Sequence, residues 1–138
     1  MTGSDGIASG SVVVYPYLWA RQHERGETEG RKDRPTAVGI RMPQKRGGDI
    51  LVLFPITSKE PASDQAAAEI PDNEKRRGGL DADKRLWIIL EEYNTDIVGK
   101  SFYLKPDSKI GRIGLAFFKP MLLTFLKNRS KLRHIPRS

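Results

Sequence analysis

The chain contains no cysteine and only two histidines among its 138 residues. Without cysteine it can form neither a disulfide nor a thiolate metal site, and it has no thiol nucleophile. The histidines, His23 and His134, lie far apart in the sequence, and neither has a partner at the spacing of a zinc site. We therefore expect no bound metal, and the lack of cysteine is consistent with a reducing compartment.

Long hydrophobic runs are also missing. No stretch approaches the roughly 20 apolar residues needed to cross a bilayer, and residues 1–10 lack the charged-then-apolar pattern of a signal peptide. We therefore expect a cytoplasmic protein with no membrane partner. The sequence has no phosphate-binding loop, dinucleotide-binding glycine motif or nucleophile elbow. No cofactor is expected, and catalysis must use Arg, Lys, Thr, Ser, Tyr, Asp or Glu.

Positive charge, in contrast, is abundant. The chain has 24 Lys and Arg against 17 Asp and Glu, which gives a net charge of +7. A basic domain of this size attracts nucleic acid through its long-range field and through counterion release. The same excess of charge can serve solubility alone, so charge by itself leaves both interpretations open.

Apolar runs rich in β-branched and aromatic residues predict short strands separated by charged loops. The most apolar run, residues 49–56, is the candidate central strand, and a Gly-containing turn joins it to residues 35–41 in a hairpin. The other predicted strands are residues 11–20, 66–70, 85–90 and 109–117. Charged loops are predicted at 21–33 and 57–65, and one or two helical turns at 71–77.

A helix is predicted near the C-terminus. Phe118, Met121, Leu122 and Phe125 recur at helical spacing, so this stripe packs in the core or in a dimer contact, with Pro120 in the first turn. Residues 1–10 and 128–138 are expected to be flexible tails of a single domain spanning residues 1–138. Four to six strands and one helix favour a mainly β (α+β) fold, as an antiparallel barrel or strongly bent sheet.

This set of residue types is sufficient to cleave RNA. The 2′-hydroxyl is an internal nucleophile beside the phosphorus, so the substrate itself supplies proximity. The protein must supply a base for that hydroxyl, an acid for the departing 5′-oxygen and cations for the phosphorane. A carboxylate, an arginine and a hydroxyl donor can fill these roles without a metal.

Three motifs follow one another in an order typical of one family. Glu29 lies five residues before Arg34-Pro35 in GETEGRKDRPTAVGI, an apolar strand ends in PITS at residues 55–58, and Gly79-Leu80 precedes WIILEEYNTD. This order, over residues 10–96, resembles the MazF/PemK/Kid family of toxin endoribonucleases. The resemblance implies an SH3-like barrel, a homodimer, and metal-independent cleavage of single-stranded RNA to 2′,3′-cyclic phosphate and 5′-hydroxyl ends.

The resemblance also implies roles for individual residues. By position, Arg34 matches the catalytic arginine of the family and Thr57 its catalytic threonine. Glu29 matches the loop glutamate and Glu91 a later acidic residue, and either is a candidate base for the 2′-hydroxyl. An acidic segment of an antitoxin protein is expected to compete with RNA for the same basic groove.

The loops at 21–33 and 57–65 are predicted to form the RNA groove. Trp19 and Tyr17 are candidates for base stacking, whereas Trp87 lies in an apolar run and is expected in the core. Histidine is a common proton-transfer residue, but His23 lies in a charged loop and is expected to be solvated. The other residues predicted to contact RNA are Arg21, Arg25, Arg31, Lys32, Lys45, Arg46, Ser58 and Lys59.

Two departures from the family pattern keep other functions open. Gly30 stands where the family has Gln, and Asn94 stands where it has Arg before a Thr. The first alternative is the same barrel without catalysis, as a nucleic-acid-binding module. The second is a protein-interaction module with incidental basic charge, which predicts no salt-dependent binding of RNA.

Overall fold

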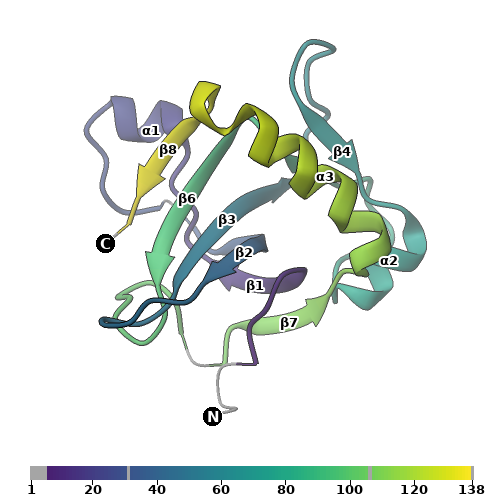
Figure 1. The fold of residues 1–138 in the computed structure, drawn as a ribbon. Coiled ribbons are helices and arrows are strands. Elements are labelled where there is room, and N and C mark those ends of the chain that lie inside the picture. The colour runs from purple at the N-terminus through teal and green to yellow at the C-terminus, as the bar shows by residue number, and fades with distance from the viewer. Residues whose placement is uncertain (1–5, 31, 106, 138) are drawn as a thin grey trace.

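The computed structural model describes residues 6–30, 32–105 and 107–137. These residues form a mainly β domain of predominantly antiparallel strands with a helix near the C-terminus, which confirms the predicted fold class (Figure 1). The strands are β1 (Ser11–Tyr15), β2 (Arg34–Met42), β3 (Ile50–Thr57), β4 (Ala67–Glu69), β5 (Trp87–Ile89), β6 (Glu92–Ile97), β7 (Lys109–Arg112) and β8 (Arg133–Pro136). The helices are α1 (Ala20–Glu24), α2 (Asp72–Arg77), α3 (Leu115–Asn128) and the short 3-10 helix η1 (Arg129–Lys131).

The predicted hairpin of β2 and β3 lies at the centre of the sheet. The two strands pair antiparallel, with Thr36 opposite Pro55 and Met42 opposite Ile50. The turn between them contains Gly48 at φ +93°, a backbone conformation that other residues rarely adopt. β3 is buried from Leu51 to Ile56, as its continuous apolar run predicts.

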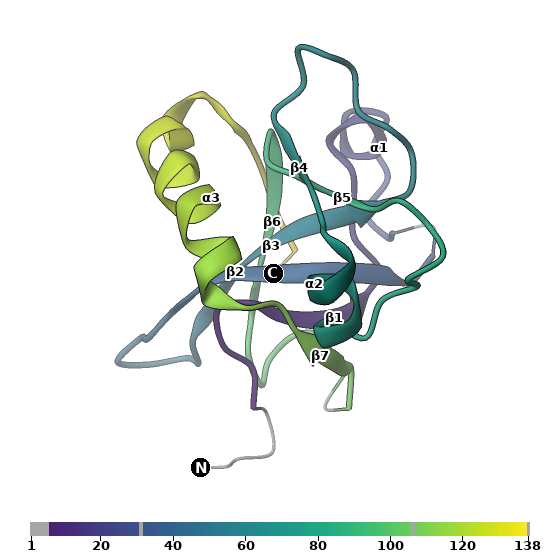
Figure 2. The ribbon, with the colours of Figure 1, turned by 90° about the vertical axis from the view of Figure 1, so that its right-hand side faces the viewer.

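β3 also bends the sheet, because two different strands share its second edge. Its first half pairs with β6, whereas Ile56 and Thr57 at its end pair with β5. On the other side, β2 is followed by β1 and then β7. The curvature of the sheet is visible in Figures 1 and 2. Alternate residues of the two central strands divide between two apolar clusters, since Ala37 and Phe54 lie in one and Val38 and Leu53 in the other, so both faces of these strands are buried.

Helix α3 covers one side of the bent sheet (Figure 2). Phe118, Met121 and Phe125 are buried, and the Phe125 ring packs edge-to-face on Phe54 at 4.9 Å and on Tyr93 at 5.1 Å between ring centroids. The apolar stripe predicted from the sequence is therefore a core contact.

The start of α3 differs from the prediction. The helix begins at Leu115, so Pro120 lies inside it, and the extended segment predicted at 109–117 is only the four residues of β7. Gly114, at the N-cap position, donates its N–H to the Glu74 carboxylate of α2 at 2.8 Å. This contact stabilises a helix N-terminus earlier than the local apolar pattern suggests.

The segment after β1 also differs from the prediction. The strand expected over residues 11–20 ends at Tyr15. Helix α1 occupies the first residues of the segment 21–33, which was expected to be a loop. Side chains of β6 hold this part of the chain. Glu92 accepts a hydrogen bond from Ala20 N at 2.8 Å, and the Asn94 amide bonds to both backbone groups of Leu18 at 2.9 and 2.8 Å. These contacts from a distant strand replace the strand ladder that the local sequence predicts.

Residues 128–138 were expected to be a flexible tail, but η1 and β8 lie there. β8 pairs parallel with β6, and Ile135 is buried. The Arg137 guanidinium donates to the Pro16 carbonyl at 2.6 Å and lies 3.9 Å from the centroid of the Tyr103 ring. Leu132 and Ile135 among charged neighbours are a weak local signal. The edge of β6 supplies the hydrogen-bond partner that makes residues 133–136 a strand.

The predicted N-terminal tail is only partly described, since residues 1–5 lie outside the described residues. Ile7 is buried, and Gly10 donates its N–H to the Val38 carbonyl at 2.8 Å, so residues 7–10 pack against β2. None of the helices in the described ranges is long and apolar enough to cross a bilayer.

Candidate functional site

The pairing of β2 with β3 brings Arg34 and Thr57 to the same end of the sheet. Arg34 is the first residue of β2, and Thr57 is the last of β3. Moving two residues along both strands from the Thr36–Pro55 pair reaches Arg34 and Thr57, so these residues lie opposite each other in the register. Both side chains line the same cleft.

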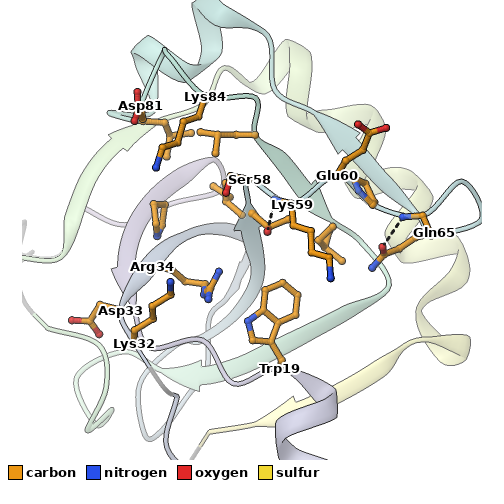
Figure 3. Close-up of a pocket in the computed structure, with 18 of the residues that line it drawn as sticks. Trp19, Lys32, Asp33, Arg34, Ser58, Lys59, Glu60, Gln65, Asp81 and Lys84 are labelled. Atoms are coloured by element: carbon orange, nitrogen blue, oxygen red, sulfur yellow. Dashed lines mark hydrogen bonds between the residues drawn. The ribbon is translucent and has the colours of Figure 1, made fainter.

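This cleft has a volume of about 780 Å³ and lies between residues 32–35 and the loop after β3. In Figure 3, Arg34, Ser58 and Lys59 lie near its middle, with Trp19 at one edge and Lys84 at the opposite edge. The volume suits a ligand of nucleotide size. Parts of the two loops predicted to form a groove therefore do face each other.

Arg34 is a half-buried guanidinium without a carboxylate partner among the described residues. Burial lowers its pKa, and the neighbouring Arg21 guanidinium lowers it further. Its guanidinium carbon lies 5.2 Å from the centroid of the Trp19 ring. A partly desolvated cation with no counter-ion favours the binding of an anion.

Thr57 and Ser58 supply hydroxyl groups beside this cation. Thr57 Oγ1 accepts a hydrogen bond from Lys59 N at 3.1 Å, so it caps the turn that follows β3. Because the hydroxyl acts as an acceptor in that bond, its proton is still available for a ligand oxygen.

The charges that line the cleft are mostly positive. Among the described lining residues there are five cations and three carboxylates, and one carboxylate, Glu60, lies 3.5 Å from Arg85 in an ion pair. In Figure 3 the carboxylates of Asp33 and Glu60 point away from Arg34. The five cations are Arg21, Lys32, Arg34, Lys59 and Lys84. This lining suits a polyanionic ligand.

Lys84 was not predicted as a site residue. It lies between α2 and β5, about 50 positions after Arg34 in the sequence, and reaches the cleft because β5 pairs with the end of β3. No local motif marks this lysine, so only the strand pairing identifies it.

Trp19 lines the cleft but is only 6% exposed. Tyr17, the other candidate for base stacking, is buried, and its hydroxyl donates to Glu92 at 3.0 Å. Neither ring offers an open face of the kind that base stacking needs. The prediction that Tyr17 stacks on a base is therefore wrong, because this side chain belongs to the core.

The structure does not bring Glu29 or Glu91 to the cleft. Glu29 accepts a hydrogen bond from the Tyr103 hydroxyl at 3.0 Å, and it does not line the cleft. Glu91 accepts one from Ala66 N at 3.2 Å and lies beside α3, where a smaller cavity of about 260 Å³ includes Thr124. The base role that the resemblance implies has no geometric basis for either glutamate.

Several predicted RNA contacts also lie outside the cleft. Lys45 and Arg46 are in the turn of the hairpin, roughly 26 Å from Arg34 along β2 at about 3.3 Å per residue. Arg25 ends α1 and is exposed, as is His23. Arg31 lies outside the described residues. The predicted residues that the cleft brings together are Trp19, Arg21, Lys32, Arg34, Thr57, Ser58 and Lys59.

The two departures from the family pattern have structural explanations. A side chain on Gly30 would collide with the carbonyl group of Pro16, so the Gln of the family pattern does not fit there. Asn94 is fully buried and holds the backbone of Leu18 next to Trp19. Both residues therefore shape the chain that leads into the cleft.

No known protein-family model matches the sequence, and no curated protein matches it significantly. Within the described residues, no group of three or more His, Asp or Glu side chains could hold a metal ion. The functional interpretation therefore depends on the cleft itself, where cations and hydroxyls can bind and polarise a phosphate group.

Proposed function

We propose that this chain is a toxin endoribonuclease that cleaves single-stranded mRNA in the cytoplasm without a metal. The proposal depends on one observation, the placement of Arg34, which has no carboxylate partner within residues 6–30, 32–105 and 107–137, opposite Thr57 in a basic cleft. The similarity of motif order to the MazF/PemK/Kid family supports the same reading. A fork of guanidinium donors matches the oxygens of a phosphodiester in charge and geometry.

In this mechanism the 2′-oxygen attacks the adjacent phosphorus and the bond to the 5′-oxygen breaks. Arg34 neutralises the phosphorane and gives a proton to the departing 5′-oxygen, and its lowered pKa makes this donation easier. Thr57 donates its hydroxyl to a non-bridging oxygen. The products are a 2′,3′-cyclic phosphate and a 5′-hydroxyl.

The 2′-hydroxyl proton passes to solvent in this proposal. Among the described residues, the candidate carboxylates do not suit the role. Glu29 and Glu91 lie outside the cleft. Of the three carboxylates that line it, Asp33 and Glu60 point away from Arg34, and Asp81 lies beside Lys84 at the edge opposite Trp19 (Figure 3). An open cleft gives water and hydroxide access to the nucleophile. The rate then depends on the solution pH rather than on a carboxylate.

Product analysis tests the proposal directly. Wild-type protein is incubated in EDTA with single-stranded RNA carrying a 5′ label, and the new ends are identified by mass spectrometry. We expect 2′,3′-cyclic phosphate ends from wild type and from Arg46→Ala, whose side chain lies in the distant hairpin turn. Cleavage by Arg34→Ala at the wild-type rate would contradict the site.

A second candidate, an RNA-binding module without catalysis, is favoured by one specific observation. The cleft is lined by five cations, but the carboxylates of Asp33 and Glu60 point away from Arg34. This candidate predicts RNA binding that weakens steeply with salt and leaves the RNA intact. The product assay therefore separates the two functions.

The proposal includes two protein partners. An acidic antitoxin segment is expected to fill the basic cleft and compete with RNA. A homodimer is expected as well, and the outer side of α3 exposes Leu123 and Leu126 at 59% and 48%. Sedimentation velocity at several concentrations tests the dimer, and a monomer at all concentrations would remove it from the proposal.

A further inference from the structure

The indole N–H of Trp19 is a buried donor without a partner. The residue is 6% exposed, and its Nε1 atom forms no hydrogen bond with any described residue. Buried tryptophan N–H groups usually find an acceptor, because leaving one unpaired is unfavourable. Trp87, the other tryptophan, has no such unpaired atom. An acceptor supplied by a ligand would satisfy the Trp19 donor.

The Trp19 ring is held firmly in place. The residue before it, Leu18, is hydrogen-bonded through its backbone to the Asn94 side chain. The residue after it, Ala20, donates its backbone N–H to Glu92. Gln22 accepts a hydrogen bond from Trp19 N at 3.1 Å, and the Tyr17 ring packs edge-to-face at 5.2 Å between centroids. The backbone on both sides of the indole is therefore fixed, and the ring itself is buried against Tyr17.

Two cations lie close to the ring. The guanidinium carbons of Arg21 and Arg34 lie 4.7 and 5.2 Å from its centroid. In Figure 3 the indole nitrogen faces the side of the cleft on which Arg34 and Lys32 lie. A ligand that satisfies both the unpaired N–H and the unpaired guanidinium must carry several acceptor oxygens and negative charge, as a phosphate group does.

We propose that Trp19 Nε1 and the Arg34 guanidinium form one phosphate-binding subsite, in which the indole N–H donates to a non-bridging phosphate oxygen. Trp19 then acts as a hydrogen-bond donor and not as a stacking platform for a base. Because Nε1 is buried, the anion reaches it when Arg34 shifts from the ring toward the phosphate. The proposal deepens the proposed function by naming the ligand group, but it requires only anion binding and no cleavage.

The test uses NMR and two probes, inorganic phosphate and a single-stranded DNA oligonucleotide, which lacks the 2′-hydroxyl and cannot be cleaved. The two indole N–H signals are assigned with Trp87→Phe, which is also the matched control. We expect both probes to shift the Trp19 signal downfield and to leave the Trp87 signal in place. Sodium chloride at equal ionic strength is expected to shift neither.

A variant separates hydrogen bonding from stacking. Trp19→Phe keeps an aromatic ring but removes the N–H, so we expect it to bind the oligonucleotide about tenfold more weakly than Trp87→Phe does. Its urea midpoint is expected to be equal to or above that of Trp87→Phe, because an unsatisfied donor is removed. If Trp19→Phe does not fold, the wild-type indole shift decides.

The outcomes are distinct from those of the cleavage assay. Oligonucleotide binding that requires Arg34 but leaves the Trp19 indole signal unmoved would overturn the subsite, as would full affinity in Trp19→Phe. An indole shift in a protein that never cleaves RNA would support the subsite and remove the endoribonuclease proposal.

Discussion

Arg34 and Arg41 lie seven residues apart on β2, yet their surroundings differ in kind. Arg41 is bonded to Asp49 at 2.7 Å and to the Ile7 carbonyl at 2.8 Å, so it ties the N-terminal segment to the hairpin. Arg34 has no carboxylate partner among the described residues and lies in the cleft beside Trp19. The contrast shows that an arginine whose donors are satisfied within the fold contributes stability, whereas one that is left unpaired is available to a ligand.

The largest expected difference between the two arginines is in activity. Arg34→Ala is expected to lower kcat/KM for RNA cleavage about 100- to 1000-fold, because it removes the charge that stabilises the phosphorane. Arg41→Ala is expected to change kcat/KM by less than about threefold while the protein remains folded. Single-turnover cleavage of a labelled RNA measures both values, and equal losses would remove the distinction.

The pH dependence of cleavage tests how Arg34 works without a carboxylate base. If the 2′-hydroxyl proton passes to solvent, the rate rises about tenfold per pH unit through the neutral range. The Arg34 pKa is lowered by burial and by Arg21, but an arginine with so high an ordinary pKa stays protonated there. Single-turnover rates between pH 5 and 8 give the slope. A plateau above pH 5 would instead indicate a carboxylate base.

In the free energy of unfolding, we expect the opposite ranking, with the larger loss in Arg41→Ala and little or none in Arg34→Ala. Arg41→Ala is expected to lower the free energy of unfolding by about 1–2 kcal/mol, because Asp49 and the Ile7 carbonyl lose their partner. Arg34→Ala is expected to leave the free energy of unfolding unchanged or slightly raised, since it removes an unpaired, partly desolvated charge. Urea unfolding at pH 7 measures both variants, and a large loss in Arg34→Ala would assign it a structural role.

The smallest expected effect concerns Glu92, which helps to hold the chain beside Trp19. Burial raises its pKa, although hydrogen bonds from Ala20 N and the Tyr17 hydroxyl oppose the shift. The folded state therefore binds this proton more tightly than the unfolded state, and wild type loses stability as the pH rises through the raised pKa.

The Glu92→Gln variant tests this sign. Because Gln keeps the acceptor without titrating, the variant is expected to gain stability relative to wild type, by less than about 1 kcal/mol, as the pH rises from 4 to 7. Urea midpoints at both pH values measure this gain, and a variant that becomes relatively less stable as the pH rises would contradict the sign.

The predicted and observed structures agree where local pattern and burial point the same way. The apolar run at 49–56 is buried as β3, and the segment from 35 to 41 pairs with it as β2. Since Arg34 and Thr57 lie at the ends of these two strands, their position could be predicted along with the strands. The β8 segment could not, because it becomes a strand only when β6 is present to pair with it, and Ile135 is buried against Leu18 and Ala20, which are distant in the sequence.

The same limit applies to the side chains of the candidate site. Glu29, Gly30 and Asn94 are close to motif positions in the sequence, but their roles depend on Tyr103, Pro16 and Leu18, which are distant along the chain. Lys84 enters the cleft only through the pairing of β5 with β3. Local sequence carries no information about such partners.

The amino-acid sequence by itself determined the mainly β fold class, the central hairpin, the basic charge and the chemistry of its two strand-end residues. Those features follow from hydrophobic periodicity and residue type, which act over a few neighbouring residues. Only the tertiary structure decided which charges are paired, which carboxylates face the cleft and why the Trp19 N–H is unsatisfied. These depend on contacts between segments far apart in the chain, where burial and partner geometry, rather than residue type, set the free energy of each polar group.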